Sequence, residues 1–148
     1  MIRLEAVNPG NWKLGLKVSD AQRNFVSDDM RLLARAYAFR EQRSNAYVIY
    51  DENTPVGMAL YYDCEEMNAY DFSQLFIDEH YQGKGFGIEA ARIILQLMEQ
   101  DGKYDKVVLC YIDGNDAARK MYEKLGFYLT GDCDENEIIM EKRLKTGK

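Results

Sequence analysis

The sequence is poor in residues that many catalytic and scaffold chemistries need. Its 148 residues include a single histidine, His80, two prolines and three cysteines. One imidazole excludes a site built on two histidines, and a Ser-His-Asp triad would have to use His80. Cys64, Cys110 and Cys133 are widely separated and form no CxxC pair. We therefore expect neither a disulfide framework nor a metal site, and we expect Cys110 to be an inert residue in a buried strand.

Long apolar runs and an excess of basic residues are also missing. No apolar stretch approaches the ~18 residues of a membrane span, and residues 1–5 lack a basic-then-apolar signal pattern. We expect a cytoplasmic protein with no membrane partner. The net charge is −6 and the pI is about 4.9. This balance disfavours nucleic acid, because phosphate binding needs clustered Lys and Arg, and it suits a small cationic partner.

What is present is the composition of one globular domain, 1–148. The chain is 47% hydrophobic and 30% charged, and its length is typical of a single domain. Apolar–polar alternation and β-branched runs predict strands over 2–7, 46–50, 56–64, 71–78 and 106–112, and a closing hairpin of 127–130 with 138–142. Helical spacing predicts a helix over 28–40 with Ser27 as N-cap, a partial helix within 11–25, a helix after residue 85, and a last helix capped by Asn115 or Asp116. This order predicts an α/β fold with an antiparallel meander followed by a βαβ unit.

A glycine-rich turn, Gln82-Gly83-Lys84-Gly85-Phe86-Gly87, follows a predicted strand and opens a predicted helix. Free N–H groups and the helix dipole make such a turn an anion site, and glycines let the backbone approach a pyrophosphate closely. Residues 85–90 also match the dinucleotide pattern G-x-G-x-x-G/A, and the glycines alone permit a tight turn without any ligand. A dinucleotide fold, however, places its glycine turn after the first strand of a parallel sheet, whereas this turn follows an antiparallel meander. No GxxxxGK[ST] string is present.

The motifs on either side of the βαβ unit resemble those of the GNAT acyltransferase superfamily. Residues 82–87 match its [Q/R]-x-x-G-x-[G/A] loop, and 75–87 resemble its fourth strand, phosphate loop and helix start. Residues 115–127 resemble its second motif, N-x-x-A-x-x-x-Y-x-x-x-G-F. In the N-terminal half, Asn11-Trp12 and Gln22-x-x-Phe25 resemble bacterial spermine/spermidine acetyltransferase-like members. The resemblance implies one GNAT-type domain: a mixed, mostly antiparallel sheet with helices on both faces and a central βαβ acetyl-CoA unit.

The same resemblance implies acetyl-CoA as co-substrate, with no metal. Its pantetheine arm would pair, where the fourth and fifth strands splay apart, with the main chain of Phe76, Ile77 and Asp78. The pyrophosphate would be held by the N–H groups of Gly83, Lys84, Gly85, Phe86 and Gly87. Gln82 would brace the turn, and Asn115 and Ala118 would contact CoA at the start of the last helix. His80 would only flank this site.

The implied chemistry is direct attack of a primary amine on the thioester. Since amines have a pKa near ~10.4, a base or a water chain must take a proton at neutral pH. Tyr122 is the candidate general acid for the departing thiolate, although it also lies on the apolar stripe of its helix. Asp71 is the candidate base, with an ordered water as the alternative. Strand alternation puts Asp71 on one face with Ser73, unless a bulge breaks the alternation.

Acidic residues around one predicted hairpin suggest how a polycation is bound. Asp63, Glu65 and Glu66 lie close in sequence to Asp71 and can grip spaced positive charges, or they can simply solvate the hairpin tip. The resemblance favours spermidine or spermine as acceptor and implies a homodimer. The alternatives are an amino acid, an antibiotic or a protein amine as acceptor, or a non-catalytic acyl-CoA sensor. Tyr122 argues against the sensor, because a sensor needs no proton donor.

Overall fold

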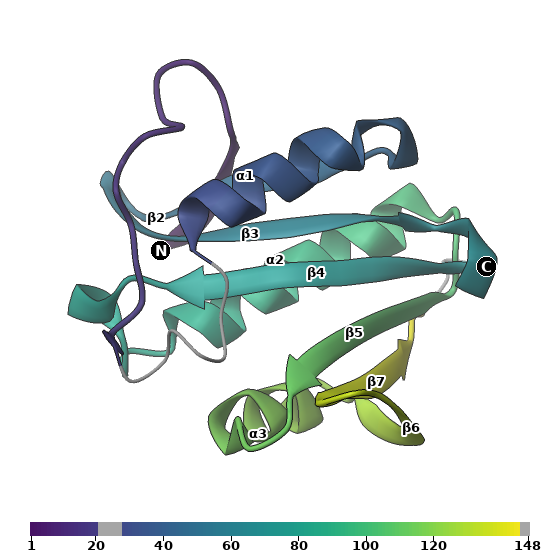
Figure 1. The fold of residues 1–148 in the computed structure, drawn as a ribbon. Helices are drawn as coiled ribbons and strands as arrows, with labels where there is room; N and C mark the ends of the chain where they lie inside the picture. Colours follow the sequence, from purple (N-terminus) through teal and green to yellow (C-terminus); the bar gives the residue numbers. More distant parts are fainter. Residues whose placement is uncertain (21–27, 146–148) are drawn as a thin grey trace.

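A seven-stranded mixed sheet organises the computed structural model, which describes residues 1–20 and 28–145 (Figure 1). The strands are β1 (Ile2–Ala6), β2 (Asn45–Asp51), β3 (Thr54–Cys64), β4 (Ala69–Ile77), β5 (Lys106–Ile112), β6 (Tyr128–Asp134) and β7 (Glu137–Arg143). They lie in the order β1-β2-β3-β4-β5-β7-β6. Only β4 and β5 pair in parallel, and the other neighbours are antiparallel. The predicted meander and βαβ unit are both confirmed.

The helices within the described residues begin and end where local chemistry allows. They are α1 (Asp29–Ala38), α2 (Phe86–Asp101) and α3 (Asp116–Lys124). The Asp28 carboxylate accepts the Arg31 N–H at the start of α1, whereas the expected cap, Ser27, lies outside the described residues. Gly102, with φ of 72°, ends α2 in the left-handed conformation that glycine adopts most readily. Asn115 caps α3 through its side chain.

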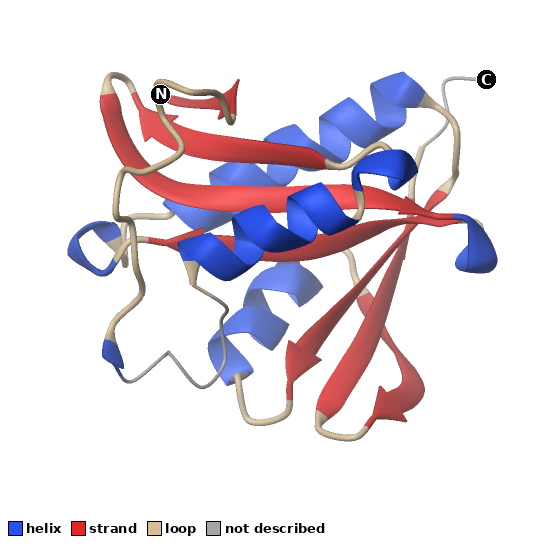
Figure 2. Ribbon diagram, turned by 45° about the horizontal axis from the view of Figure 1, so that its top comes forward, coloured by secondary structure: helices blue, strands red, loops and turns tan. Residues whose placement is uncertain are grey.

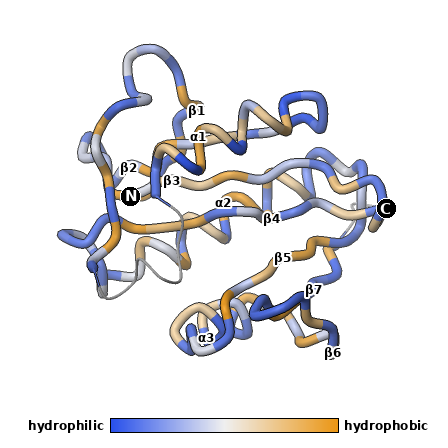
Figure 3. The backbone as a smooth tube through the Cα atoms, viewed as in Figure 1, coloured by the Kyte–Doolittle hydropathy of each residue, from blue (hydrophilic) through white to orange (hydrophobic). Residues whose placement is uncertain are grey.

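The helices cover both faces of the sheet (Figures 1 and 2). α2 and α3 pack on one face against a main core that includes Ala90, Ile94 and Tyr122. α1 packs on the other face against a smaller core around Leu32. Hydrophobic residues follow β5, while the loops are mostly hydrophilic (Figure 3). The expected two-sided α/β architecture is confirmed.

The partial helix predicted within 11–25 does not fall on residues 11–19. Residues 11–19 contain no helix, and 21–25 lie outside the described residues. Asn11 accepts the Asn8 N–H at 2.8 Å and fixes a turn, and Gly15 has a positive φ of 70°. Leu16 and Val18 are both buried on the second core, so the chain crosses the sheet in an extended form. Side chains two residues apart share a face in extended chain and not in a helix.

A bulge interrupts β4 at Ser73. The β3–β4 register passes from Leu60 opposite Gln74 to Tyr61 opposite Phe72, which leaves Ser73 without a partner. As a result Phe72 packs in the main core, while Phe76 packs in the core beneath α1. Four residues apart, the two would share a face in a regular strand. The simple alternation of Asp71 with the rest of β4 is therefore broken, as the bulge alternative anticipated.

Two negative findings concern only residues 1–20 and 28–145. None of the helices there combines the length and the hydropathy of a membrane span. That part of the chain also contains no group of three or more His, Cys, Asp and Glu side chains placed to hold a metal ion.

Candidate active site

The sheet opens between β4 and β5. The two strands pair at only two positions, Tyr70 with Val107 and Asp71 with Val108. Beyond Asp71 the strands diverge, as the ribbon shows (Figure 1). The second half of β4 therefore keeps its pairing with β3 but has no strand on its other edge. Unpaired backbone groups on such an edge can pair with an added extended chain.

Backbone direction decides which residues of β4 face this opening. The Phe76 carbonyl points at β3, since a Cβ built on Gly57 would lie 2.2 Å from it. The Asp78 N–H donates to the Val56 carbonyl at 2.7 Å, and the Asp78 carbonyl accepts from Tyr81. Successive backbone groups of a strand point to opposite sides, so the Ile77 groups face the opening.

Of the expected pantetheine-pairing set, Phe76, Ile77 and Asp78, the backbone directions place only Ile77 at the open edge, and the pairing itself stays a prediction. The Asp78 backbone groups and the Phe76 carbonyl are already directed at partners within the chain. By alternation, Leu75 shares the direction of Ile77 and joins it at the open edge. Sequence reasoning missed Leu75 because the direction of a backbone carbonyl leaves no trace in residue type.

The glycine turn closes the end of this opening. Gly83 and Gly85 both have φ of 81°, and a side chain at either position would be strained even though space is available. Gly85 is the N-cap residue of α2 and supplies no side chain, so the first N–H groups of the helix have no partner within it. At Gly87 an added Cβ would lie 3.5 Å from both Ile77 and Met121, an ordinary van der Waals contact, so this position does not require glycine. The turn thus offers free N–H groups at a helix N-terminus.

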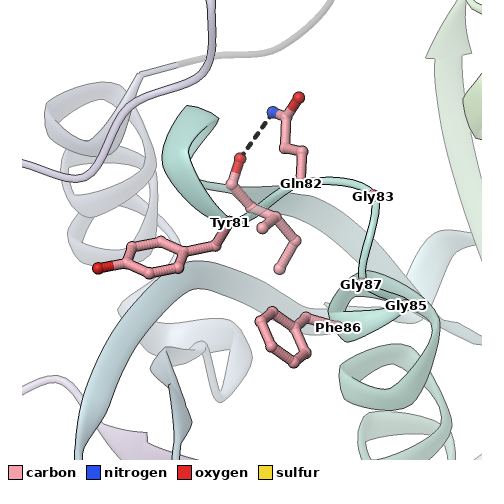
Figure 4. Close-up of a pocket in the computed structure, with 7 residues that line it drawn as sticks. Tyr81, Gln82, Gly83, Gly85, Phe86 and Gly87 are labelled. Atoms are coloured by element: carbon pink, nitrogen blue, oxygen red, sulfur yellow. Dashed lines mark hydrogen bonds between the residues drawn. The ribbon is translucent and has the colours of Figure 1, made fainter.

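A pocket of about 270 Å³ lies between the turn and the end of β4 (Figure 4). Its lining consists of Ile77, Tyr81, Gln82, Gly83, Gly85, Phe86 and Gly87. The Gln82 side-chain amide donates to the Ile77 carbonyl at 2.9 Å and ties the turn back to β4. The Phe86 ring lies below Gln82 and Gly83 in the view of Figure 4. The pocket brings together seven residues that lie next to one another around the turn, with a backbone-rich wall suited to an anionic group.

Tyr122 approaches the opening from the α3 side of the sheet. Its side chain is only 8% exposed and makes edge-to-face contacts with Phe72 and Phe127. Burial raises the pKa of Tyr122 well above its ordinary value, so the hydroxyl stays protonated at neutral pH. Within the described residues this hydroxyl makes no hydrogen bond. It is therefore a neutral donor with its proton unused.

Asp71 is the last residue of β4 that pairs with β5, and its side chain lies on the face of the sheet opposite to Tyr122. It stands across from Tyr62 of β3, whose ring packs beneath α1. Burial raises the pKa of Asp71 to about 6, Arg35 on α1 opposes the shift, and Glu137 on β7 adds to it. A carboxylate with this pKa is ionised at neutral pH and is basic enough to take a proton. Asp71 and Tyr122 thus flank the start of the opening from opposite faces.

The bulge residue Ser73 links α1 to the same place. The Ser73 hydroxyl lies 3.3 Å from Arg35 Nη1 and 3.2 Å from the Tyr62 hydroxyl, both of which donate to it. Arg35 was not singled out from the sequence, since it is one of several exposed-looking charges on α1. Its partner is 38 residues away, and only the bulge turns Ser73 toward it.

The acidic hairpin is divided between two environments. Asp63 is 4% exposed, and its carboxylate accepts Arg43 Nε at 2.7 Å and Lys103 Nζ at 3.0 Å. Burial alone would raise the pKa of Asp63, but the hydrogen bonds from Arg43 and Lys103 outweigh it and lower the pKa. Glu65 and Glu66 lie exposed in a short 3-10 helix. The geometry therefore gives Asp63 partners within the chain and leaves only the two glutamates open to a ligand.

The remaining candidates lie around the pocket or on its far side. Lys84 is exposed on the turn. The Asn115 side chain accepts the Ala118 N–H at 3.3 Å, and Ala118 is half-buried at the start of α3. His80 is largely exposed and contacts the Asp78 carboxylate through Nδ1 at 2.8 Å. Cys110 is exposed, which corrects the expectation of a buried residue: burial on β5 ends at Leu109, one position before it. Partial desolvation and the nearby carboxylates Glu137, Asp71 and Asp134 raise the pKa of Cys110 to about 11.

Comparison with known proteins places this geometry in context. Residues 16–127 match the Acetyltransferase (GNAT) family. The chain is 33% identical over 103 residues to a probable spermine N(1)-acetyltransferase of Bacillus subtilis subsp. natto, a match covering 65% of this chain and 68% of that protein. The spermine/spermidine N(1)-acetyltransferase of Bacillus subtilis strain 168 gives the same identity and coverage.

Solved structures agree at the level of the fold. Spermidine N-acetyltransferase from Vibrio cholerae, solved with CoA and spermine, superposes with a TM-score of 0.77 at 17% identity, covering 96% of this chain and 95% of that one. An aminoglycoside acetyltransferase, AAC(6')-Ib in complex with coenzyme A, gives 0.79 at 15% identity, covering 97% and 95%. The family match spans more than half of the sequence and the expected motifs lie at the opening of the sheet. The chain belongs to the acetyltransferase (GNAT) family.

Proposed function

We propose that this GNAT acetyltransferase transfers the acetyl group of acetyl-CoA to a primary amine of a small polycation, spermine or spermidine, by direct attack within a ternary complex. The observation that carries the proposal is the opening between β4 and β5, flanked by Asp71 on one face and Tyr122 on the other. The relatives named for spermine and spermidine acetylation, at 33% identity, support the acceptor class.

Acetyl-CoA supplies an activated thioester, and the chain supplies the groups that bind and orient it. The free N–H groups at the turn from Gly83 to Gly87 would hold the pyrophosphate. The edge of β4 at Leu75 and Ile77 would pair with the extended pantetheine arm, which carries amide groups of its own. This placement brings the thioester toward the start of the opening, where Phe72 meets Tyr122.

In the reaction we propose, the acceptor enters as an ammonium ion and Asp71 removes a proton, which leaves a neutral nucleophile. The amine nitrogen then forms a bond to the acetyl carbon, and the bond from that carbon to sulfur breaks. A second proton leaves the nitrogen for solvent as the neutral amide forms, and solvent later restores the proton that Tyr122 gives up. Tyr122 donates its proton to the departing thiolate. General acid and base steps of this kind contribute about 10²–10⁴-fold each. The raised pKa of Tyr122 keeps the hydroxyl protonated before the reaction, so a proton donor is present as negative charge develops on the departing sulfur.

The acceptor side has a charge suited to a polycation. Asp71 on β4, Asp134 on β6 and Glu137 on β7 all raise the pKa of Cys110 on β5, so these three carboxylates lie near the same part of the sheet. The positive charge of Arg35 lowers the pKa of Asp71, and the Arg35 side chain is already hydrogen-bonded to Ser73. Glu65 and Glu66 stay candidates for a distal ammonium. Homodimerisation also stays a prediction.

The test is a steady-state assay of CoA release with acetyl-CoA and spermine, spermidine, putrescine, lysine or an aminoglycoside, with products identified by mass. We expect saturable turnover with spermine and spermidine, and intersecting double-reciprocal lines as the two substrates are varied. If only the aminoglycoside or only lysine were acetylated, the proposal of a polyamine acceptor would be wrong and that compound class would take its place. Parallel lines with an acetylated enzyme would contradict direct attack.

A further inference from the structure

The Asp78 carboxylate is hydrogen-bonded through both of its oxygens and lies near the cofactor pocket, although Asp78 does not line that pocket. Its side chain is 7% exposed, at the junction of β4 and the short helix η4 (Glu79–Tyr81). One oxygen accepts the Lys17 N–H at 3.0 Å. The other accepts the His80 N–H at 3.0 Å and contacts His80 Nδ1 at 2.8 Å. These bonds come from two segments: the bond from Lys17 joins residues 61 positions apart in the chain, whereas the bonds from His80 are local.

The first of those segments, residues 16–18, is fixed to the end of β4 at two points. While the Lys17 N–H donates to the Asp78 side chain, the Lys17 carbonyl accepts the Glu79 N–H at 2.8 Å. Leu16 and Val18, on either side, are buried in the core beneath α1. Figure 1 shows this purple segment passing the end of β4, next to the chain that leads into α2. The segment is therefore held on one side by the packing of Leu16 and Val18 in the core, and on the other by the hydrogen bonds of Lys17.

The second segment is the start of the cofactor turn itself. Asp78 is the N-cap of η4, and η4 leads through Tyr81 and Gln82 into the glycines. Tyr81 and Gln82 both line the pocket, and Gln82 bonds back to Ile77, the residue before Asp78 (Figure 4). The glycines have no side chains with which to fix their own position. The position of the turn consequently depends on what holds η4.

We propose that Asp78 is a positioning residue that couples segment 16–18 to the glycine turn, so that packing beneath α1 holds the turn in its CoA-binding form. Burial alone would raise the pKa of Asp78, but the Lys17 and His80 hydrogen bonds outweigh it and lower the pKa. The carboxylate is therefore ionised and an acceptor at both oxygens at neutral pH. This inference rests on the proposed use of acetyl-CoA but is independent of the acceptor.

The direct test is CoA affinity measured by calorimetry, without an acceptor, for Asp78→Asn and Val18→Ala. In Asp78→Asn, the side-chain NH2 group replaces one of the two oxygens that accept backbone N–H groups, so one of these hydrogen bonds is lost. We therefore expect CoA to bind about tenfold more weakly. Val18→Ala loosens the far end of the segment without touching the turn, and we expect CoA binding about fivefold weaker. The double variant should lose less than the product of the two effects, because both act through one contact. In turnover, KM for acetyl-CoA should rise while kcat is retained.

The matched control is Val48→Ala, a fully buried valine of the same core that lies on β2, two strands away from β4. It should lower the melting temperature by a similar amount and leave CoA affinity unchanged. Equal losses of affinity in Val18→Ala and Val48→Ala would overturn the coupling and leave only a general effect of stability.

A second measurement separates this inference from the proposed function. Amide hydrogen exchange of residues 79–87 needs no ligand, and we expect Val18→Ala to accelerate it together with that of 16–18. If wild-type protein bound no CoA, the proposed function would fail, while the exchange result would still decide the coupling. Unchanged exchange at 79–87 in Val18→Ala would overturn it.

Discussion

The two edges of β4 behave differently, although they belong to one strand. On the β3 side, pairing runs from Gly57 opposite Ile77 to Cys64 opposite Ala69, interrupted only at the bulge. On the β5 side, pairing ends after two residues. The closed edge satisfies its backbone groups within the protein, while the open edge leaves them for a ligand. Stability therefore depends on the first edge and the proposed chemistry on the second, so substitutions on the two should have separable effects.

The largest effect belongs to the open edge. We expect Tyr122→Phe to lower kcat by about 10³-fold, because the thiolate loses its proton donor. CoA affinity and melting temperature should be retained, since the ring contacts with Phe72 and Phe127 stay. Steady-state kinetics and calorimetry on the same preparation measure both. Unchanged turnover would remove Tyr122 from the mechanism.

The closed edge should respond in stability instead. A Cβ at Gly57 would lie 2.2 Å from the Phe76 carbonyl, a backbone atom that cannot move without separating the strands. We expect Gly57→Ala to cost about 3 kcal/mol of unfolding free energy, at the upper end of overpacking effects. Urea denaturation measures this cost. A stability within 0.5 kcal/mol of wild type, a limit set by ordinary surface changes, would show that the two strands are not held so tightly.

Asp71 should reveal itself in the pH profile. With its pKa raised to about 6, the carboxylate is protonated below that pH and cannot accept a proton. We therefore expect kcat/KM to fall as pH decreases through about 6, and Asp71→Asn to lose about 10²-fold at pH 8 together with this acidic limb. If kcat/KM of Asp71→Asn still fell as pH decreased through about 6, that pH dependence would belong to another group, and an ordered water would be favoured as the base.

Asp63 sharpens the comparison, because it lies on β3 opposite Tyr70 of β4, near the hairpin, and was expected to bind the acceptor. Its partners Arg43 and Lys103 are each nearly half exposed, so we expect Asp63→Asn to cost only about 2 kcal/mol of stability, less than a fully buried pair. The lowered pKa means that this stabilisation is present at neutral pH and is lost as pH falls below the ordinary aspartate range. KM for spermine should not change. A raised KM with unchanged stability would return Asp63 to the acceptor site.

The smallest effect provides the baseline. Asp105 pairs with Arg143 at 3.3 Å, and both side chains are more than half exposed. We expect Asp105→Asn to change the unfolding free energy by less than about 0.5 kcal/mol and to leave both KM values unchanged. Parallel denaturation and kinetic measurements check it. A larger effect would mean that exposed charges at this end of the sheet influence the site, and the Asp63 result would then need the same correction.

How far the sequence predicts this protein depends on how local each feature is. The cap at Asn115, one of the two residues expected there, and the left-handed end of α2 at Gly102 both follow from a few adjacent residues. The turn from Gly83 to Gly87 is equally local. The partial helix predicted within 11–25 does not fall on residues 11–19, where the alternation of Leu16, Lys17 and Val18 could have indicated an extended chain.

Features that join distant residues could not be predicted. The bulge at Ser73 depends on the register with β3, and the bond from Arg35 depends in turn on the bulge. The ion pairs of Asp63 span 20 and 40 residues of sequence. Burial at these positions is decided by tertiary packing, and no short pattern carries it. The candidate site is thus predictable at its cofactor end and unpredictable at its acceptor end.

The most direct test of the central claim, that transfer takes place at the open edge of β4, is a crystal structure with CoA and spermine. We predict that the pantetheine arm pairs with the backbone of Leu75 and Ile77, with the sulfur beside the Tyr122 hydroxyl and one spermine nitrogen beside Asp71. An arm that binds elsewhere, or an amine on the far side of the sheet from Asp71, would contradict the account.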